Sequence, residues 1–567
     1  GDGEIIFEHG GGLKILDLKT EKVRQVKVSV LTDGATMRPK VEDVSRNVRN
    51  SGISPNGKRA AFEARGDIFT VPAEHGVTRN ITLSSGVAER YPAWSPDGKT
   101  IAYMSDRSGE YELTTRPAEG GEETKLTSLG AGYKYTPQWS PDSRKIAFID
   151  KAMRMWLHDL DTGKTTAVDK GLWMYHGDLE GFRVSWSSDS RWFAYSRGQD
   201  NQNGAIYLYD TKDNTSHQVT AGYYNDSDPA FDPEGKYLYF KSGRDFNPIY
   251  SDLDETWIYT NSTQLFAVPL RADVKSPLAT RNDDESDAGK DEKKPEEGKK
   301  PEPAKNKPVE IELKDFERRA VELPIQPGRY SQLQAVAGKL LYMRRPRNGS
   351  ADRNSQLVSY DIEDREEKTL EENASSFEVA AGGRKMLVNS RGSWTIRNIG
   401  GGGFGGFGGR SRGGDESSPG KDKLGLDLSD MQMTVDPRAE WRQIFDDAWR
   451  IERDYFYDPG MHGNNWEGVH KQYGALLNQC ATRWDVNFLL GEMIGEINSS
   501  HTYRWGGDSE SSKSLNVGML GCDYDLANGA DTAALNVIND LRVTQRLPYG
   551  GELEARLLTQ ATQQLTG

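Results

Sequence analysis

The sequence predicts a mainly β protein, a seven-bladed β-propeller followed by a smaller α-rich subdomain. A turn motif of the Ser-Pro-Asp-Gly type recurs every 41 to 47 residues, and its copies begin at Ser54, Ser95, Ser140, Ser187 and Asp232. An apolar strand follows each copy, for example at residues 101–103. After residue 436 the hydrophobic period changes from two to 3.6 residues, which indicates helices.

The turn motif is explained by local chemistry. In residues 95–98, proline pre-sets φ, aspartate bonds the nearby backbone and glycine accepts a strained dihedral angle. A repeat of about 40–45 residues is typical of a four-stranded propeller blade. One such sheet cannot bury both of its faces, so the blades must stack into a ring.

The blades follow one another along the chain. Residues 1–44 hold strand-like pieces without the motif, and we expect them to be the end of a preceding domain. Residues 45–398 form the propeller, and two weaker copies of the repeat at 325–368 and 370–398 bring the expected number of blades to seven. Residues 272–308 are rich in Lys, Glu, Asp and Pro, which predicts a disordered insert in the fifth blade.

The C-terminal third changes character. The glycine-rich range 399–435 favours a flexible linker over a phosphate- or RNA-binding loop, because no strand and helix flank it. Asp436 and Pro437 are typical of a helix start, and residues 436–515 are expected to form a helical subdomain. Residues 516–567 form the tail, and the helix-turn-helix pattern expected for 531–567 matches no module that we can place.

Composition excludes several functions. The 567-residue chain has a net charge of −14, which argues against nucleic-acid binding, and it has no apolar run that could span a membrane. The two cysteines, Cys480 and Cys522, suit neither a disulfide framework nor a metal site, and we expect no metal and no cofactor. We expect a cytoplasmic protein, with the periplasm as the alternative because the sequence opens within a strand and without Met.

One of the eight histidines is a candidate for catalysis. His501 follows an apolar helix and lies among Ser499, Ser500, Thr502 and Tyr503, whose hydroxyls could fix its tautomer. A histidine needs such an orienting neighbour to act as a general base. Spacing alone nevertheless favours a structural or capping role over a catalytic one.

A family resemblance changes this balance. Residues 436–508, above all Arg-Asp-Tyr-Phe-Tyr-Asp at 453–458 and Ser-His-Thr-Tyr at 500–503, resemble the first core subdomain of tricorn-type serine peptidases. The propeller with its charged insert and glycine-rich linker resembles the seven-bladed propeller of that family. The resemblance implies that residues 1–44 are the end of a preceding, six-bladed propeller. The resemblance implies hydrolysis of oligopeptides, a homo-oligomeric full-length enzyme, His501 as the general base and Ser500 as a residue that orients the catalytic groups.

The sequence also departs from the family. The family's nucleophilic serine lies in a later subdomain behind a PDZ module, and residues 531–567 do not show a PDZ pattern. We therefore expect a truncated or rearranged copy that is incomplete or inactive as an isolated chain. The alternative is a non-catalytic, TolB-like propeller scaffold that binds a protein partner. A prolyl-oligopeptidase relative is a further possibility, but no Gly-x-Ser-x-Gly motif supports it.

Overall fold

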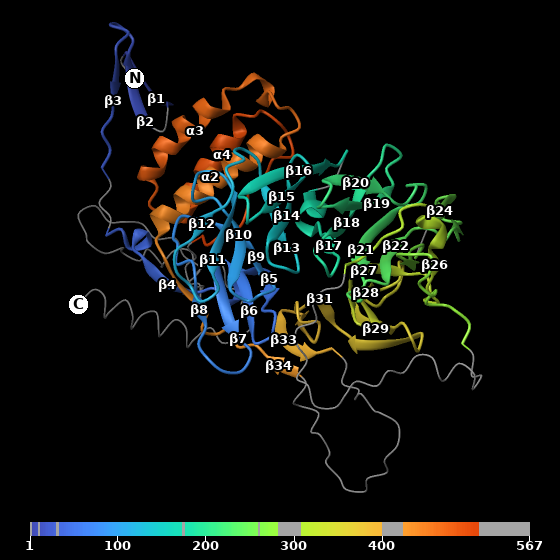
Figure 1. Ribbon diagram of the computed structural model, residues 1–567. Coiled ribbons are helices and arrows are strands. Elements are labelled where there is room, and N and C mark those ends of the chain that lie inside the picture. The colour runs from blue at the N-terminus through green and yellow to red at the C-terminus, as the bar shows by residue number, and fades with distance from the viewer. Residues whose placement is uncertain are drawn as a thin grey trace, which may run out of the picture. The chain divides into compact units, whose positions relative to one another are not determined.

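The computed structural model describes residues 3–9, 12–29, 33–172, 176–258, 261–281, 308–399 and 423–509. Within these ranges the chain forms seven four-stranded antiparallel sheets and a helical domain (Figure 1). The predicted fold class, a propeller followed by helices, is confirmed.

The sheets follow the order of the chain. The first four are β5–β8 (Val48–Ile53, Arg59–Ala64, Asp67–Pro72, Arg79–Asn80), β9–β12 (Glu89–Trp94, Thr100–Ser105, Glu112–Pro117, Thr124–Lys125), β13–β16 (Lys134–Trp139, Lys145–Asp150, Arg154–Asp159, Lys164–Lys170) and β17–β20 (Ser185–Trp186, Trp192–Gly198, Gly204–Asp210, Thr215–Gln218). The others are β21, β22, β25 and β26 (Asp226–Phe231, Tyr237–Ser242, Gln264–Pro269, Val321–Glu322), β27–β30 (Arg329–Val336, Lys339–Arg345, Gln356–Asp361, Glu366–Glu371) and β31–β34 (Ala374–Val379, Lys385–Ser390, Ser393–Asn398, Lys423–Gly425).

The sheets close into a ring through their first strands. β5 contacts β9, β9 contacts β13, and β27 contacts β31. β31 in turn contacts β5, and the amide of Gly382 donates a hydrogen bond to the carbonyl oxygen of Pro55 over 3.2 Å. The first strand of each sheet is therefore the innermost one, as in a propeller. Fully buried aromatic side chains such as Tyr103, Phe148 and Phe193 fill the space between sheets.

The repeated motif builds the hairpin turn between the first two strands of a sheet. Ser95 Oγ accepts a hydrogen bond from the Thr100 amide over 3.0 Å and donates one to Asp97 over 2.7 Å. Asp97 accepts from the Lys99 amide over 3.0 Å. Ser140 and Asp142 repeat the arrangement in the next sheet. The interpretation of the motif as turn chemistry is confirmed.

Two strands lie in the range that we expected to be a linker. β34 is the fourth strand of the last sheet, and β35 (Gln432–Val435) pairs with β4 (Lys40–Asp43). Both are short and pair with distant segments, so no local period indicates them. Residues 400–422, like 282–307 of the expected insert, lie outside the described residues. The fifth sheet also carries an exposed hairpin, β23 (Ile249–Ser251) and β24 (Thr256–Ile258).

The remaining elements are a ribbon and helices. β1 (Glu4–His9), β2 (Gly12–Asp17) and β3 (Val23–Gln25) form a three-stranded sheet. The helices are α1 (His176–Gly181), α2 (Pro437–Tyr455), α3 (Trp466–Gly474) and α4 (Arg483–Gly495), and α2 to α4 share one apolar core. Asp436 caps α2 as predicted. None of the described helices is both long and apolar enough to cross a membrane. The tail from residue 510 lies outside the described residues.

Candidate active site

Helix α4 leads directly to the predicted catalytic histidine. Thr482 and Asp485 cap its start reciprocally: the Asp485 amide donates to Thr482 Oγ1 over 3.2 Å, and the Thr482 amide donates to the Asp485 carboxylate over 2.8 Å. Val486 and Met493 on its inner face are fully buried. The helix is therefore fixed at its start and along its length.

The end of α4 is held by side chains from the segment between α2 and α4. His462 Nδ1 lies 2.9 Å from the carbonyl oxygen of Ile497, and Asn464 Nδ2 donates to the carbonyl oxygen of Glu496 over 2.7 Å. The Tyr473 hydroxyl donates to the Glu496 carboxylate over 2.6 Å. The bonds of His462 and Asn464 satisfy carbonyl groups that a helix end leaves unpaired, and all three bonds fix the chain up to Ile497, four residues before His501.

His501 itself lies outside the packed helices. Its side chain is exposed, and its backbone has a positive φ of 63°. Its ring contacts the Tyr503 ring edge-on, with centroids 6.2 Å apart, and its ring nitrogens make no hydrogen bond to another described residue. The Thr502 hydroxyl bonds the Ser499 carbonyl oxygen instead, over 2.9 Å. The expected fixing of the imidazole by neighbouring hydroxyls is thus not seen among the described residues, and the catalytic role of His501 stays a prediction.

Ser500 precedes His501 and is also exposed. Its carbonyl oxygen accepts a hydrogen bond from Ser499 Oγ over 3.4 Å, and its side chain bonds no other described residue. The structure thus brings Ser500 and His501 together only as chain neighbours. An orienting role for Ser500 stays a prediction as well.

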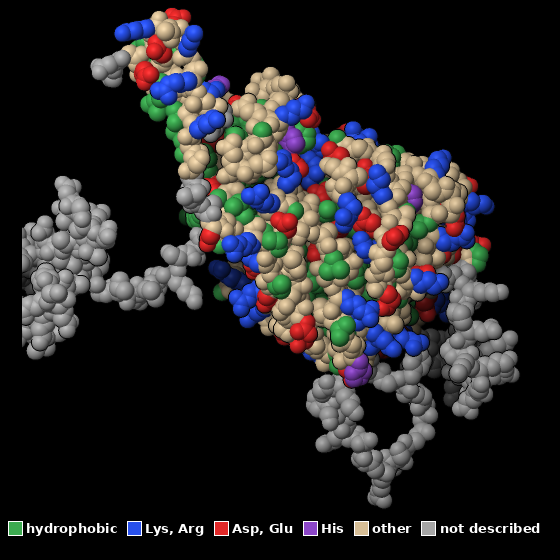
Figure 2. All heavy atoms as spheres, turned by 90° about the vertical axis from the view of Figure 1, so that its left-hand side faces the viewer, with side chains coloured by type: hydrophobic (Ala, Val, Ile, Leu, Met, Phe, Trp, Pro, Cys, Tyr) green, Lys and Arg blue, Asp and Glu red, His purple; other side chains and the backbone are tan. Residues whose placement is uncertain are grey.

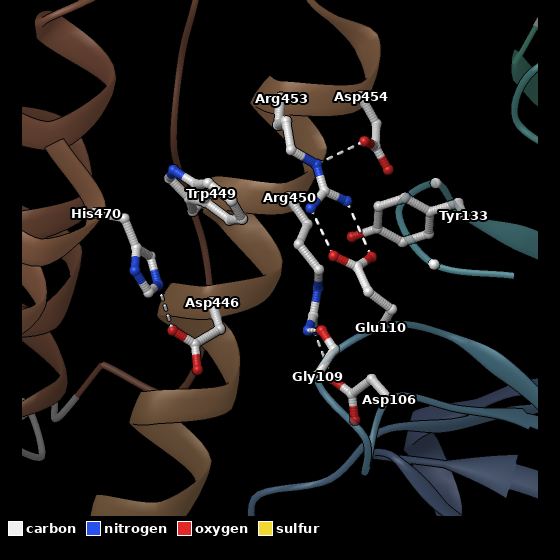
Figure 3. Close-up of polar contacts among 12 residues, drawn as sticks. Asp106, Gly109, Glu110, Tyr133, Asp446, Trp449, Arg450, Arg453, Asp454 and His470 are labelled. Atoms are coloured by element: carbon white, nitrogen blue, oxygen red, sulfur yellow. Dashed lines mark hydrogen bonds and ion pairs between the residues drawn. The ribbon is translucent and has the colours of Figure 1, made fainter. Parts of the chain in front are cut away.

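The helical domain docks on the propeller through one buried and one half-buried ion pair on α2 (Figure 3). The guanidinium of Arg450 lies 2.5 Å from Asp106 Oδ2 and 3.1 Å from Asp447 Oδ1, and it donates to the carbonyl oxygen of Gly109 over 2.7 Å. Arg453 forms a bidentate pair with Glu110 over 2.5 and 2.9 Å. Because the propeller partners lie in the loop between β10 and β11, they fix α2 on that side of the ring.

Electrostatics favours this docking. Burial tends to raise the pKa of Asp447, but Arg90 and Arg450 outweigh it, so the pKa of this carboxyl lies below its ordinary value. The Tyr133 hydroxyl donates to Asp447 over 2.5 Å. Outside this interface, acidic and basic side chains are interspersed over the face shown in Figure 2. The buried charges at α2 are therefore matched within the protein.

Two other histidines have roles that the sequence did not show. His462 holds the end of α4, as described above. His470 Nε2 lies 2.8 Å from Asp446 Oδ1, which joins α3 to α2 beside the ring of Trp449 (Figure 3). The partners are distant in sequence, and no motif connects them. In the described part of the chain, no group of three or more His, Cys, Asp or Glu side chains is placed to bind a metal ion.

The fold and this arrangement define a seven-sheet propeller joined to a small helical domain, and comparisons with known proteins identify both parts. Residues 48–400 match the tricorn protease second beta propeller domain, and residues 437–495 match the tricorn protease C1 domain. The chain belongs to the tricorn protease family.

Individual relatives support the same assignment. Tricorn protease homolog 1 of Streptomyces coelicolor is 28% identical over 538 residues, which cover 92% of this chain and 48% of that protein. A tricorn protease homolog of Saccharolobus solfataricus is 23% identical over 537 residues, covering 92% and 45%. A crystal structure of the tricorn protease shares the fold with a TM-score of 0.72 and 19% identity, over 92% of this chain and 48% of that one. The chain thus spans about half the length of these relatives.

Proposed function

We propose that this chain forms the propeller and base-bearing part of a serine-type peptidase that hydrolyses oligopeptides. In this proposal His501 takes the proton from a serine hydroxyl as that hydroxyl attacks the peptide carbonyl, and later returns it to the leaving amine. The observation that carries the proposal is an exposed imidazole on a segment that follows the end of α4, where His462 and Asn464 hold the backbone. Such an imidazole is accessible to a hydroxyl from elsewhere in the protein.

In this proposal the nucleophilic serine lies outside residues 1–567. Ser499 and Ser500 precede His501 in the chain, and the bonds that the structure gives their side chains do not reach the imidazole. General-base catalysis needs the two groups within about 2.6–3.2 Å of one another in the reacting complex. A hydroxyl from a part of the enzyme that packs against the 499–503 segment would meet this requirement. Ser500 would then help to position that segment.

The propeller has the role of a filter in this proposal. Its first strands surround the central axis, so a peptide could pass only in an extended or loosely folded form. The buried pair of Arg450 and the half-buried pair of Arg453 hold the helical domain against one side of the ring. A rigid connection of this kind would keep the base in a constant position relative to the passage.

Peptide hydrolysis by the full-length protein tests the proposal. His501→Ala is expected to lower kcat/KM by at least about 100-fold, the usual contribution of a general base. His75→Ala is the matched control, because the His75 side chain is 89% exposed and belongs to a propeller loop. If both variants keep full activity, His501 is not the base. A full-length protein without peptidase activity that still binds a protein partner would favour the scaffold alternative.

A further inference from the structure

A pocket of about 280 Å³ lies between the sixth and seventh sheets. Its polar lining comes from the start of β27, the end of β28 and the starts of neighbouring segments, namely Arg329, Ser331, Gln332, Arg345, Ser355 and Ser375. No acidic side chain is among the lining residues. In a chain with a net charge of −14, a pocket lined by two arginines and hydroxyl groups is a distinctive feature.

The two arginines lie opposite each other. Arg329 and Arg345 are paired across the antiparallel strands β27 and β28. Like charges in this position destabilise a sheet. Among the described residues, no carboxylate lies within 4 Å of either guanidinium, and Arg329 donates one weak hydrogen bond, to the carbonyl oxygen of Pro346 over 3.4 Å. A bound anion would remove this repulsion.

The next residue pair in the same two strands contains an arginine that does have a carboxylate partner. Tyr330 is paired with Arg344, whose guanidinium forms an ion pair with Glu367 and lies over the Tyr330 ring. Arg344 is thus neutralised within its own sheet. Arg329 and Arg345 lie on the opposite face of these strands, and neither has a carboxylate partner among the described residues.

The position of the pocket relates it to the passage that the proposed function assigns to the ring. Ser331, Gln332 and Ser375 belong to β27 and β31, which are innermost strands, and β27 has a register shift at Gln332, where φ is 56°. Arg329 is the first residue of β27, the first strand of its sheet, and Arg345 is the last residue of β28, the second strand. In the antiparallel sheets these ends lie on the side of the ring that carries the loop from β10 to β11, and hence α2.

We propose that Arg329 and Arg345 form a carboxylate-binding site at this mouth of the passage, which binds peptides through a C-terminal or side-chain carboxylate. A guanidinium binds a carboxylate with two parallel hydrogen bonds, and the serine hydroxyls can donate further ones. The site deepens the proposed function, on which the choice of peptides as ligands rests. The site would select peptides that carry a negative charge on the side of the ring where the helical domain is docked.

Fluorescence anisotropy tests the site by binding alone, so its outcome does not depend on hydrolysis. The probes are penta-alanine with an N-terminal fluorophore and a free C-terminus, the corresponding C-terminal amide, and the amide with one alanine replaced by glutamate. The free acid is expected to bind the full-length protein at least about tenfold more tightly than the amide, since a charge-assisted hydrogen bond contributes more than a neutral one. Recovery of affinity in the glutamate peptide would show that a side-chain carboxylate also serves, and no recovery would restrict the site to the C-terminus.

The double variant Arg329→Gln/Arg345→Gln is expected to lose this preference and to bind acid and amide alike. Both arginines are exposed, and removing their repulsion should leave the thermal stability equal or higher. Arg318→Gln is the matched control, because its side chain is 85% exposed and lies away from the pocket. Equal binding of acid and amide by the unchanged protein, or an unchanged preference in the double variant, would overturn the proposal. Stronger competition by inorganic phosphate than by acetate would overturn the assignment to carboxylates.

Discussion

Replacement of Arg450 tests how the helical domain is held on the propeller. The Arg450 side chain is 5% exposed, and its guanidinium contacts two carboxylates and one carbonyl group. Arg450→Met keeps most of the side-chain volume but leaves the buried Asp106 without its cation. Removing one partner of a buried ion pair costs about 3–5 kcal/mol.

The expected loss lies near the lower end of that range. Asp447 keeps Arg90 at 2.7 Å and the Tyr133 hydroxyl, and Asp106 keeps hydrogen bonds from Gln443 and the Ala88 amide. We therefore expect Arg450→Met to lower the free energy of unfolding by about 3 kcal/mol. Urea unfolding followed by tryptophan fluorescence measures this value, because Trp441 and Trp449 lie in α2.

Arg438→Met is the control for this measurement. Arg438 lies on the same helix with an exposed side chain, so its replacement should change the free energy of unfolding by less than about 0.5 kcal/mol. Faster hydrogen exchange of the α2 amides in Arg450→Met alone would locate the loss at the docking surface. If the two variants unfold at the same urea concentration, the buried pair does not hold the domains together.

Three further predictions concern local features. Burial raises the pKa of Glu89 from 4.5 to about 8. Between these pH values the unfolded chain releases a proton that the folded chain keeps. The free energy of unfolding should therefore fall, as the pH rises, by up to about 1.4 kcal/mol per pH unit. Glu89→Gln should flatten this slope in urea unfolding from pH 5 to 8, and an unchanged slope would show that Glu89 is not its source. Thr482→Ala should cost about 1 kcal/mol by removing the cap of α4, and a thermal midpoint equal to that of the unchanged protein would refute this role. A Cβ at Gly382 would lie 2.8 Å from the Pro55 carbonyl oxygen, so Gly382→Ala should lower the free energy of unfolding by about 1–3 kcal/mol at the contact that closes the ring. A Cβ at Gly383 would meet no atom within 4 Å, so Gly383→Ala is the comparison that shows the cost of a positive φ alone.

Much of the propeller could be predicted because its signal is local. Ser95 and Asp97 bond amides within five residues, so the turn is encoded in one short stretch and returns with each blade. β34 and β35 could not be predicted, because three- and four-residue strands have no measurable period and pair with distant segments. The glycine-rich composition around them indicated only a linker.

The residues of the candidate site also differ in whether a local sequence pattern indicates them. His501 could be singled out as a candidate because the residues around it form one short motif, and its catalytic role stays a prediction. The contacts of His462 with Ile497 and of Arg450 with Asp106 join residues 35 and 344 positions apart, and neither has a sequence signal. The pocket of Arg329 and Arg345 also escaped prediction, because strand register alone brings the two arginines together.

Labelling of the full-length protein with a fluorophosphonate, followed by peptide mass mapping, tests the central claim most directly. This reagent phosphonylates a serine hydroxyl that a neighbouring base has activated. We expect one labelled serine outside residues 1–567 and labelling at least about 100-fold slower in His501→Ala. A label on a serine within residues 1–567, or an equal rate in the His501→Ala variant, would contradict the account.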